Sequence, residues 1–188
     1  MPEPKFNPRI HHRHSIRLRG FDYSSVGAYF VTIVAHGREC LFGEVVDGDV
    51  KLNDVGKIAD ECWRAIPEHF PNVDLGVHII MPNHAHGIIV IRPDESPIGV
   101  GATHWVAPTT TNTRPAGPKR GSLGAIIGSY KMAVTRQIQR QHNISQIWQR
   151  NYYEHVIRND REMERIWHYI EANPSMWAGD DENPSRGR

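Results

Sequence analysis

The chain has 188 residues, of which 39% are hydrophobic and 23% are charged, and its net charge is +1. These values are typical of one globular domain that is long enough to bury a core. No run approaches the ~18 apolar residues of a membrane span, and the N-terminus lacks the apolar centre of a signal peptide. Because Cys40 and Cys62 form no Cys-x-x-Cys unit, the sequence predicts no disulfide framework and a reducing, cytoplasmic location.

Charge is distributed unevenly along the chain. Residues 1–20 hold five Lys or Arg and one acid, residues 21–92 hold five and ten, and residues 111–168 hold ten and four. The first segment is therefore expected to be a basic N-terminal arm. If the basic segments meet in space, they form one face that attracts phosphate, whereas the simpler interpretation is a set of ordinary solvated faces.

The first half of the chain predicts mostly strands. In order, the pattern indicates a strand at 28–35, a hairpin at 41–52, a helix at about 53–69, and two paired strands at 73–81 and 84–92. Asp47-Gly48 is typical of the type I′ turn of a hairpin. Asn53 or Asp54 can cap the helix, and Pro67 is expected to end it early.

The second half predicts two helices and a strand. Residues 93–120 are rich in Gly, Pro and Thr and are expected to form a flexible insertion. A helix at 122–141 and an aromatic strand at 148–157 follow, and Asn159 can cap a last helix that stops by Pro174. Core spacing in that helix is shared by Met163, Ile166, Trp167 and Ile170.

This order of elements predicts an α+β, ferredoxin-like sandwich. A central antiparallel sheet would carry helices on one face, with the hairpin at 41–52 as an addition. Residues 21–177 would form this single domain, and residues 178–188 a loose polar tail.

The segment with the most specific chemistry is Met81-Pro82-Asn83-His84-Ala85-His86-Gly87, at the start of an aliphatic strand. Side chains alternate along a strand, so His84 and His86 point the same way and provide half of a metal site. The alternative is that both are polar residues on an exposed face. His78 on the neighbouring strand is a further possible ligand, although a hydrogen-bonded core histidine is favoured there.

Tyr169 and Asn173 lie four residues apart, on one face of the last predicted helix and beside its apolar stripe. If that helix packs over the two histidines, Asn173 becomes a third metal ligand and Tyr169 lies beside the site. Imidazole suits transition metals, whereas an amide oxygen and phosphate suit Mg²⁺ or Mn²⁺, and Mn²⁺ tolerates both kinds of ligand. The alternatives are a packed aromatic ring for Tyr169 and a helix C-terminal residue for Asn173. Tyr152 and Tyr153 are rivals of Tyr169 for a reactive role. They face opposite ways on a strand, so at most one of them can reach the site; Tyr153 is taken as the rival nucleophile, although packing or base stacking is expected for both.

On these residues the chain resembles the HUH nucleases, and among them the REP-associated tyrosine transposases. The resemblance covers most of the chain and rests on the His84–His86 strand and on further segments: Arg17–Tyr23, Gly27–Thr32, Cys40–Gly43, Ser122–Ile127, Trp148–His155 and Tyr169–Pro174. It implies that His84, His86 and Asn173 bind the metal and that Tyr169 is the nucleophile. It also implies that the substrate is single-stranded DNA with an imperfect hairpin flanked by a short guide sequence.

The expected function is a metal-dependent single-stranded DNA endonuclease and transesterase, which cleaves at or near hairpins through a 5′-phosphotyrosine and rejoins strands. The alternatives are a hairpin-binding regulator without cleavage and an HUH replication or transfer initiator. Monomer and dimer both stay open. The residues expected to contact DNA are Arg13, Arg17, Arg19, Lys119, Arg120, Lys131, Arg150 and Arg158.

Overall fold

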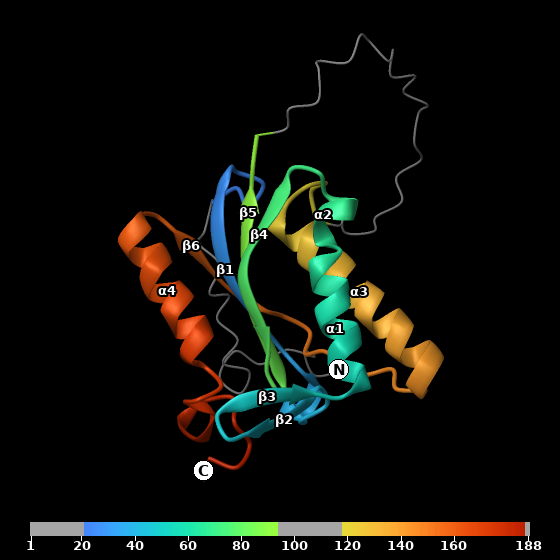
Figure 1. Cartoon of the computed structure of the whole chain (residues 1–188). Helices are drawn as coiled ribbons and strands as arrows, with labels where there is room; N and C mark the ends of the chain where they lie inside the picture. The colour runs from blue at the N-terminus through green and yellow to red at the C-terminus, as the bar shows by residue number, and fades with distance from the viewer. Residues whose placement is uncertain (1–20, 94–117, 187–188) are drawn as a thin grey trace, which may run out of the picture.

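A computed structural model describes residues 21–93 and 118–186 and shows a sheet with helices on both faces (Figure 1). Four antiparallel strands follow the order β4-β5-β1-β6, and two short strands form a separate hairpin. The strands are β1 (Gly27–Val34), β2 (Gly43–Val46), β3 (Asp49–Leu52), β4 (Val73–Ile80), β5 (His84–Ile91) and β6 (Tyr153–Ile157). The helices are α1 (Asp54–Arg64), α2 (Ile66–His69), α3 (Leu123–His142) and α4 (Asp160–Ala172).

Local sequence signals set several element ends as expected. Asp47 and Gly48 both have positive φ, of 54° and 84°, which is the conformation of a type I′ turn. The helix after this hairpin is interrupted at Ala65, shortly before Pro67. Three helices begin where a polar side chain accepts a backbone N–H of the first turn: Asn53, Ser122 and Asn159.

The α+β class, the antiparallel sheet and the additional hairpin are confirmed. The placement of the helices differs in one respect, because α4 lies on the face opposite to α1 and α3 (Figure 1). Tyr29 and Val31 of β1 belong to the core under α1 and α3, whereas Phe30 packs with Ile166 and Ile170 of α4. Both faces of the sheet therefore carry apolar side chains, and the last helix buries its stripe on the second one.

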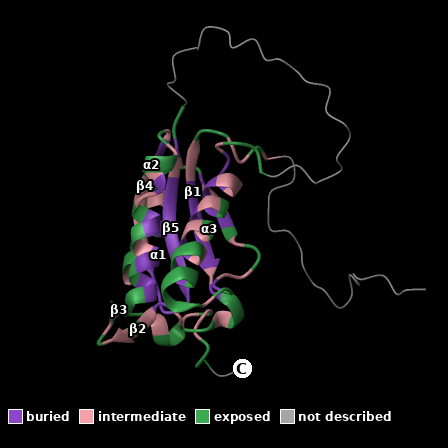
Figure 2. Cartoon of the chain, turned by 90° about the vertical axis from the view of Figure 1, so that its right-hand side faces the viewer, coloured by how far each residue is buried: buried purple, intermediate pink, exposed green. Residues whose placement is uncertain are grey.

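The core under α1 and α3 is the larger of the two. Figure 2 shows β5 and β1 buried behind these helices, whose outer surfaces are exposed. Trp63 of α1 is fully buried and meets Tyr130 of α3 edge to face, with 5.2 Å between ring centroids. The indole also lies so close to β5 that a Cβ on Gly87 would be 2.2 Å from Trp63 Cζ2. Glycine at this position is therefore a packing requirement.

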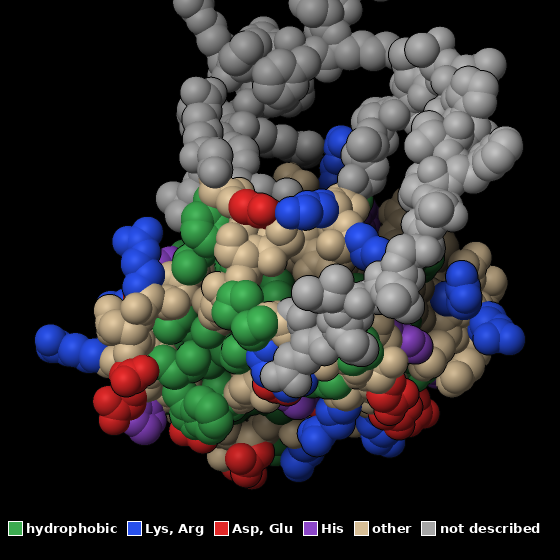
Figure 3. Space-filling view, turned by 90° about the horizontal axis from the view of Figure 1, so that it is seen from above, with side chains coloured by type: hydrophobic (Ala, Val, Ile, Leu, Met, Phe, Trp, Pro, Cys, Tyr) green, Lys and Arg blue, Asp and Glu red, His purple; other side chains and the backbone are tan. Residues whose placement is uncertain are grey.

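The core under α4 is smaller and reaches the surface. Its fully enclosed centre is Ile88 and Ile170, and Met163 packs at its margin. Trp167, which the spacing predicts to be in the core, is 41% exposed because it lies at the border of the apolar stripe. Figure 3 shows hydrophobic side chains at the surface on the side where α4 packs against β4.

Residues 177–186, most of which the composition predicts to be a loose tail, are held in place by hydrogen bonds. The segment begins with a 3-10 turn at Trp177–Gly179. Asn83 Nδ2 then donates to Glu182 O at 2.7 Å, and Arg38 Nη1 donates to Asp181 O at 2.8 Å. The segment therefore packs beside the start of β5.

The predicted basic arm and residues 94–117 of the predicted insertion lie outside the described residues. Among the helices that the structure describes, none is both long enough and apolar enough to cross a membrane.

Candidate active site

Two buried histidines begin β5 on the face that α4 covers. His84 and His86 are 0% and 3% exposed, and their ring centroids lie 4.4 Å apart. In the register of the sheet they pair with Val34 and Thr32 of the central strand β1. The predicted alternation is therefore observed, and a rigid pair of strands positions both rings.

Asn83 determines which nitrogen of His84 carries a proton. Its Nδ2 donates to two backbone carbonyl oxygens, Arg38 O at 3.0 Å and Glu182 O at 2.7 Å, which orients the amide. Its Oδ1 lies 2.9 Å from His84 Nδ1 and can only accept. His84 Nδ1 must therefore carry the proton, and the lone pair of His84 Nε2 points into the site.

The second imidazole is fixed in a similar way. Thr32 Oγ1 lies 2.9 Å from His86 Nδ1. His86 Nε2 faces the hydroxyl of Tyr169, which approaches it from α4 at 3.4 Å. The predicted docking of the last helix over the two histidines is therefore what the structure has.

Two buried polar atoms at this place lack a hydrogen-bond partner in the described part of the chain: His84 Nε2 and Asn173 Oδ1. Asn173 follows α4 and is 2% exposed, and its Nδ2 donates to Asp180 Oδ2 at 3.2 Å. Ligand atoms of His84, His86 and Asp180 lie within 4.8 Å of one another. Imidazole nitrogens and amide or carboxylate oxygens are metal ligands, so the residues present fit a divalent cation.

Tyr169 lies at the border between core and solvent. Its side chain is 47% exposed, and its ring meets Phe30 edge to face at 6.0 Å. The hydroxyl opens into a 420 Å³ cleft that His86, Asn173 and Tyr153 also line. The rival tyrosine, Tyr153, therefore shares this cleft, but no contact between its hydroxyl and the histidines is seen within the described residues.

Burial dominates the electrostatics of the histidines. It lowers the pKa of His84 to about 4, although the nearby Asp180 carboxylate and Asn173 amide act in the opposite direction. Burial also lowers the pKa of His86, and the charge of His84 adds to this effect. Both imidazoles are therefore neutral at physiological pH, which is the form that binds metal.

The phenol of Tyr169 experiences opposing influences. Burial and the negative charge of Asp180 raise its pKa, whereas the Asn173 amide lowers it. In this environment the phenol is a poor nucleophile by itself. A cation beside it would offset the carboxylates.

The residues expected to contact DNA divide into three groups. Arg120, Arg150 and Arg158 are exposed, and Lys119 is exposed but bonded to Asp22 at 3.1 Å. Lys131 is directed inward and donates to backbone carbonyls, which makes it a poor phosphate contact. The three N-terminal arginines lie outside the described residues: Arg13, Arg17 and Arg19.

The structure also shows the role of His78, which the sequence offered as a further possible metal ligand. His78 bonds Asp60 at 2.8 Å and stacks on Trp63, on the opposite face of the sheet from the two candidate ligands. It is therefore a hydrogen-bonded core histidine, as favoured. Sequence reasoning missed Asn83 and Asp180 as site residues, although the Met-Pro-Asn tripeptide directly before His84 was a signal for the first.

Two proteins of Haemophilus influenzae are among those similar to this chain in sequence. An uncharacterized protein of Haemophilus influenzae is 39% identical over 181 residues, which cover 94% of this chain and 96% of the relative. The chain belongs to the same family as that protein. A second H. influenzae protein, with the name "Putative REP-associated tyrosine transposase", is 24% identical over 81% of this chain and 73% of its own length.

The solved structure of a REP-associated tyrosine transposase bound to a REP hairpin shares the fold, with a TM-score of 0.55 and 16% identity. The alignment covers 88% of this chain and 74% of that chain. No protein-family model matches the chain. The resemblance to the REP-associated tyrosine transposases is confirmed.

Proposed function

We propose that the chain is a metal-dependent single-stranded DNA endonuclease and transesterase of the transposase type. One observation supports this above the others: the Tyr169 hydroxyl lies 3.4 Å from His86 Nε2. A phenol, which can act as a nucleophile, therefore lies beside the imidazole of His86 in a cleft open to solvent, and this supports the proposal.

The metal would be Mg²⁺ or Mn²⁺, held by His84 and His86 with an oxygen from Asn173 or Asp180. Asn173 is the ligand that the sequence predicts, and its Oδ1 is buried without a partner in the described residues. Asp180 supplies a carboxylate at a comparable position. When bound, the cation would neutralise charge on the phosphate and hold it in line with the phenol.

The proposed step is a transesterification. Tyr169 loses its phenolic proton to solvent, and its oxygen attacks phosphorus. The bond between phosphorus and the 3′ oxygen breaks, and that oxygen leaves with a proton from solvent as a 3′-hydroxyl. The product is a 5′-phosphotyrosine, and another 3′-hydroxyl can reverse the step and join strands. A single nucleophile is sufficient for this sequence of events.

The proposed substrate is single-stranded DNA with a hairpin, as in the solved REP-hairpin complex of the similar protein. Three exposed arginines of this chain can contact phosphate: Arg120, Arg150 and Arg158. The proposed location is the cytoplasm, with which the free thiols of Cys40 and Cys62 are compatible.

The test is formation of a covalent adduct on a labelled hairpin oligonucleotide with single-stranded flanks. Wild-type protein should form an adduct that survives denaturing electrophoresis in Mn²⁺ but not in EDTA. Tyr169→Phe should bind the oligonucleotide and form no adduct, and Tyr153→Phe, a matched change in the same cleft, should form it. An adduct with Tyr169→Phe, or its loss with Tyr153→Phe alone, contradicts the assignment.

One observation favours a second function, which is hairpin binding without cleavage. The cleft is lined by Asp180, Asp181 and Glu182, whose negative charge opposes the approach of a phosphate. A binding-only protein would shift the labelled hairpin in a native gel and leave it intact in both Mn²⁺ and EDTA.

A further inference from the structure

The hydrogen bonds of His86 differ in kind from those of His84. The proton of His84 is fixed on Nδ1, because its partner there, Asn83 Oδ1, can only accept. Both partners of His86 are hydroxyl groups, Thr32 Oγ1 at 2.9 Å from Nδ1 and the Tyr169 oxygen at 3.4 Å from Nε2. A hydroxyl group can donate or accept, so the partners alone allow two arrangements of protons along this chain of three side chains.

The chemistry of the two hydroxyl groups favours one of these arrangements. His86 is 3% exposed, and its neutral imidazole carries one proton, on one of the two ring nitrogens. A phenol is more acidic than an aliphatic alcohol, which makes Tyr169 the better donor and Thr32 the better acceptor. Tyr169 therefore donates to Nε2 of His86, and Nδ1–H of His86 donates to Thr32 Oγ1.

Strand β1 holds the imidazole ring of His86 in this orientation. Thr32 is 8% exposed and lies opposite His86 in the register of β1 and β5. Phe30, two residues earlier on the same face of β1, stacks on the imidazole with 5.4 Å between ring centroids and 29° between ring planes. Rotation of the imidazole, which would exchange its two nitrogens, is therefore opposed by a hydrogen bond at its edge and by a ring on its face.

The hydrogen bond from Tyr169 occupies the nitrogen of His86 that would bind a metal. With the proton on Nδ1, the single nitrogen lone pair of this ring is on Nε2. One lone pair cannot accept a hydrogen bond and bind a cation together, so Tyr169 must give up its bond to His86 when His86 binds an ion. His84 has no such competitor, because its Nε2 lacks a hydrogen-bond partner in the described part of the chain.

We propose that Thr32, His86 and Tyr169 form one hydrogen-bonded chain that controls access to the metal site. Thr32 keeps the proton of His86 on Nδ1, and the phenol of Tyr169 covers Nε2 until a divalent cation displaces it. Thr32 is thereby a positioning residue, and the phenol is released for reaction only when the site is filled. This inference rests on the proposed function, because it takes His86 as a metal ligand and Tyr169 as the nucleophile.

The arrangement of protons is tested on the metal-free protein by NMR spectra that correlate the ring nitrogens and protons of histidine. In wild-type protein, His86 should be protonated on Nδ1 and have a free lone pair on Nε2. In Thr32→Val, a second form with the proton on Nε2 should appear, because Nδ1–H has lost its acceptor. Thr32→Ser keeps the hydroxyl and should restore the wild-type spectrum. A wild-type His86 with its proton on Nε2 overturns the proposal.

Calorimetry with Mn²⁺ tests the competition between Tyr169 and the cation. Tyr169→Phe removes the hydroxyl that the ion must displace, so this variant should bind Mn²⁺ about 2–10-fold more tightly than wild type, the range that corresponds to one net hydrogen bond. Tyr153→Phe, a matched change at the other tyrosine of the cleft, should bind Mn²⁺ like wild type. Equal or weaker binding by Tyr169→Phe, or no binding of Mn²⁺ by either protein, contradicts the competition.

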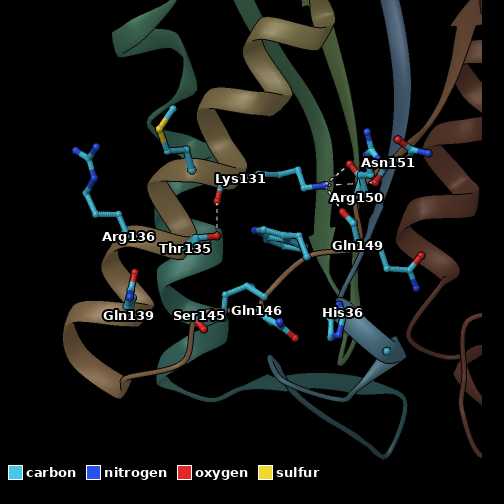
Figure 4. A pocket seen from close by; sticks show the side chains of 14 residues that line it. His36, Lys131, Thr135, Arg136, Gln139, Ser145, Gln146, Gln149, Arg150 and Asn151 are labelled. Carbon is cyan, nitrogen blue, oxygen red and sulfur yellow. Dashed lines mark hydrogen bonds between the residues drawn. The ribbon is translucent and has the colours of Figure 1, made fainter. Parts of the chain in front are cut away.

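The positioning role of Thr32 is tested in the same assay. Thr32→Val should weaken Mn²⁺ binding about tenfold or more, as is usual when a partner that orients a metal ligand is lost, and Thr32→Ser should restore it. The matched control is Thr135→Val on α3. The Thr135 hydroxyl donates to Lys131 O at 2.8 Å, beside a 1060 Å³ pocket between α3 and residues 145–151 (Figure 4).

Thr135→Val also loses a side-chain hydrogen bond, but one that involves neither of the two candidate metal ligands at the start of β5. It should leave Mn²⁺ affinity and the spectrum of His86 unchanged. An equal loss of Mn²⁺ affinity in Thr32→Val and Thr135→Val would show a general loss of packing, and Thr32 would then have no positioning role.

Failure of the proposed function is seen separately. If Tyr169→Phe binds Mn²⁺ more tightly but wild-type protein forms no adduct with DNA in Mn²⁺, then the hydrogen-bonded chain is correct and Tyr169 is not a nucleophile. If wild-type protein forms the adduct and Tyr169→Phe binds Mn²⁺ no more tightly, then the proposed function stands and the hydrogen-bonded chain is wrong.

Discussion

The two faces of the sheet differ in what they bury. Under α1 and α3 the strands contribute an almost entirely apolar surface, which includes Tyr29, Ile33 and Ile89. Under α4 the same strands contribute Phe30 and Ile88 at one end, and at the other end the polar side chains of the candidate active site. The first face therefore provides most of the hydrophobic stabilisation. The second face provides less, because part of its buried surface consists of imidazoles and an amide, which are costly to remove from water.

The comparison predicts that one substitution has very different effects on the two faces. Trp63→Ala, in the large core, should lower the free energy of unfolding by about 3–5 kcal/mol, because it removes a fully buried indole and leaves a cavity. Trp167→Ala, on α4, should change it by no more than about 0.5–1 kcal/mol, since that side chain is 41% exposed. Urea unfolding followed by circular dichroism measures both. Equal losses would mean that α4 carries as much of the core as α1.

A smaller effect is expected from two isoleucines that are both fully buried. Ile170→Ala on α4 and Ile138→Ala on α3 should each lower the free energy of unfolding by about 2–3 kcal/mol. Ile170 neighbours Tyr169, so only its substitution should shift the phenol and slow adduct formation, by about tenfold or more. Adduct formation is measured at a temperature where both variants are folded. If Ile138→Ala slows adduct formation as much as Ile170→Ala does, then the candidate active site does not depend on the α4 face in particular.

Removal of the Asn83 side chain tests the polar end of the α4 face. Asn83→Ala frees His84 Nδ1 and leaves two backbone carbonyls without their donor. Mn²⁺ affinity, measured by calorimetry, should fall about 10–100-fold, as is usual when a group that orients a metal ligand is lost. The control is Asn53→Ala, which also loses a donated and an accepted hydrogen bond, but at the start of α1.

Asn53→Ala should cost about 1 kcal/mol of stability and leave Mn²⁺ affinity unchanged. If both variants bind Mn²⁺ like wild type, then the imidazole of His84 does not need its partner, or the ion binds elsewhere. Either result would remove Asn83 from the candidate site.

These residues also show how far the sequence predicts the site. Asn53 and Asn159 act on backbone atoms within their own first helical turn, so their roles follow from local pattern. The alternation of His84 and His86 is local in the same sense. Asn83, in contrast, bonds residues 45 and 99 positions away, and no periodicity in the sequence encodes such partners.

The local sequence pattern also does not predict which face of the sheet α4 covers, for a related reason. The apolar stripe of the helix indicates that it must be buried, but both faces of the sheet offer apolar side chains. The sequence alone could therefore offer the contact between Tyr169 and His86 only as a hypothesis about the face on which the last helix packs. The same limit applies to Asp180, which reaches the histidines from a segment with the composition of a tail.

The smallest predicted effect concerns Lys131, whose ammonium is half-buried on the α3 side of the sheet. Burial lowers the pKa of Lys131 to about 8 from 10.5. Between pH 8 and 10.5 the unfolded chain therefore binds more protons at this residue than the folded chain does. The free energy of unfolding of wild type, minus that of Lys131→Met, should rise as pH increases through this window and be level below it.

Urea unfolding at several pH values measures this difference, and Lys51→Met, which removes an exposed ammonium from β3, is the control. The difference between wild type and Lys51→Met should stay level over the same range. A level difference for Lys131→Met as well would mean that the pKa of Lys131 is the same in the folded and the unfolded chain, so that burial does not destabilise its ammonium.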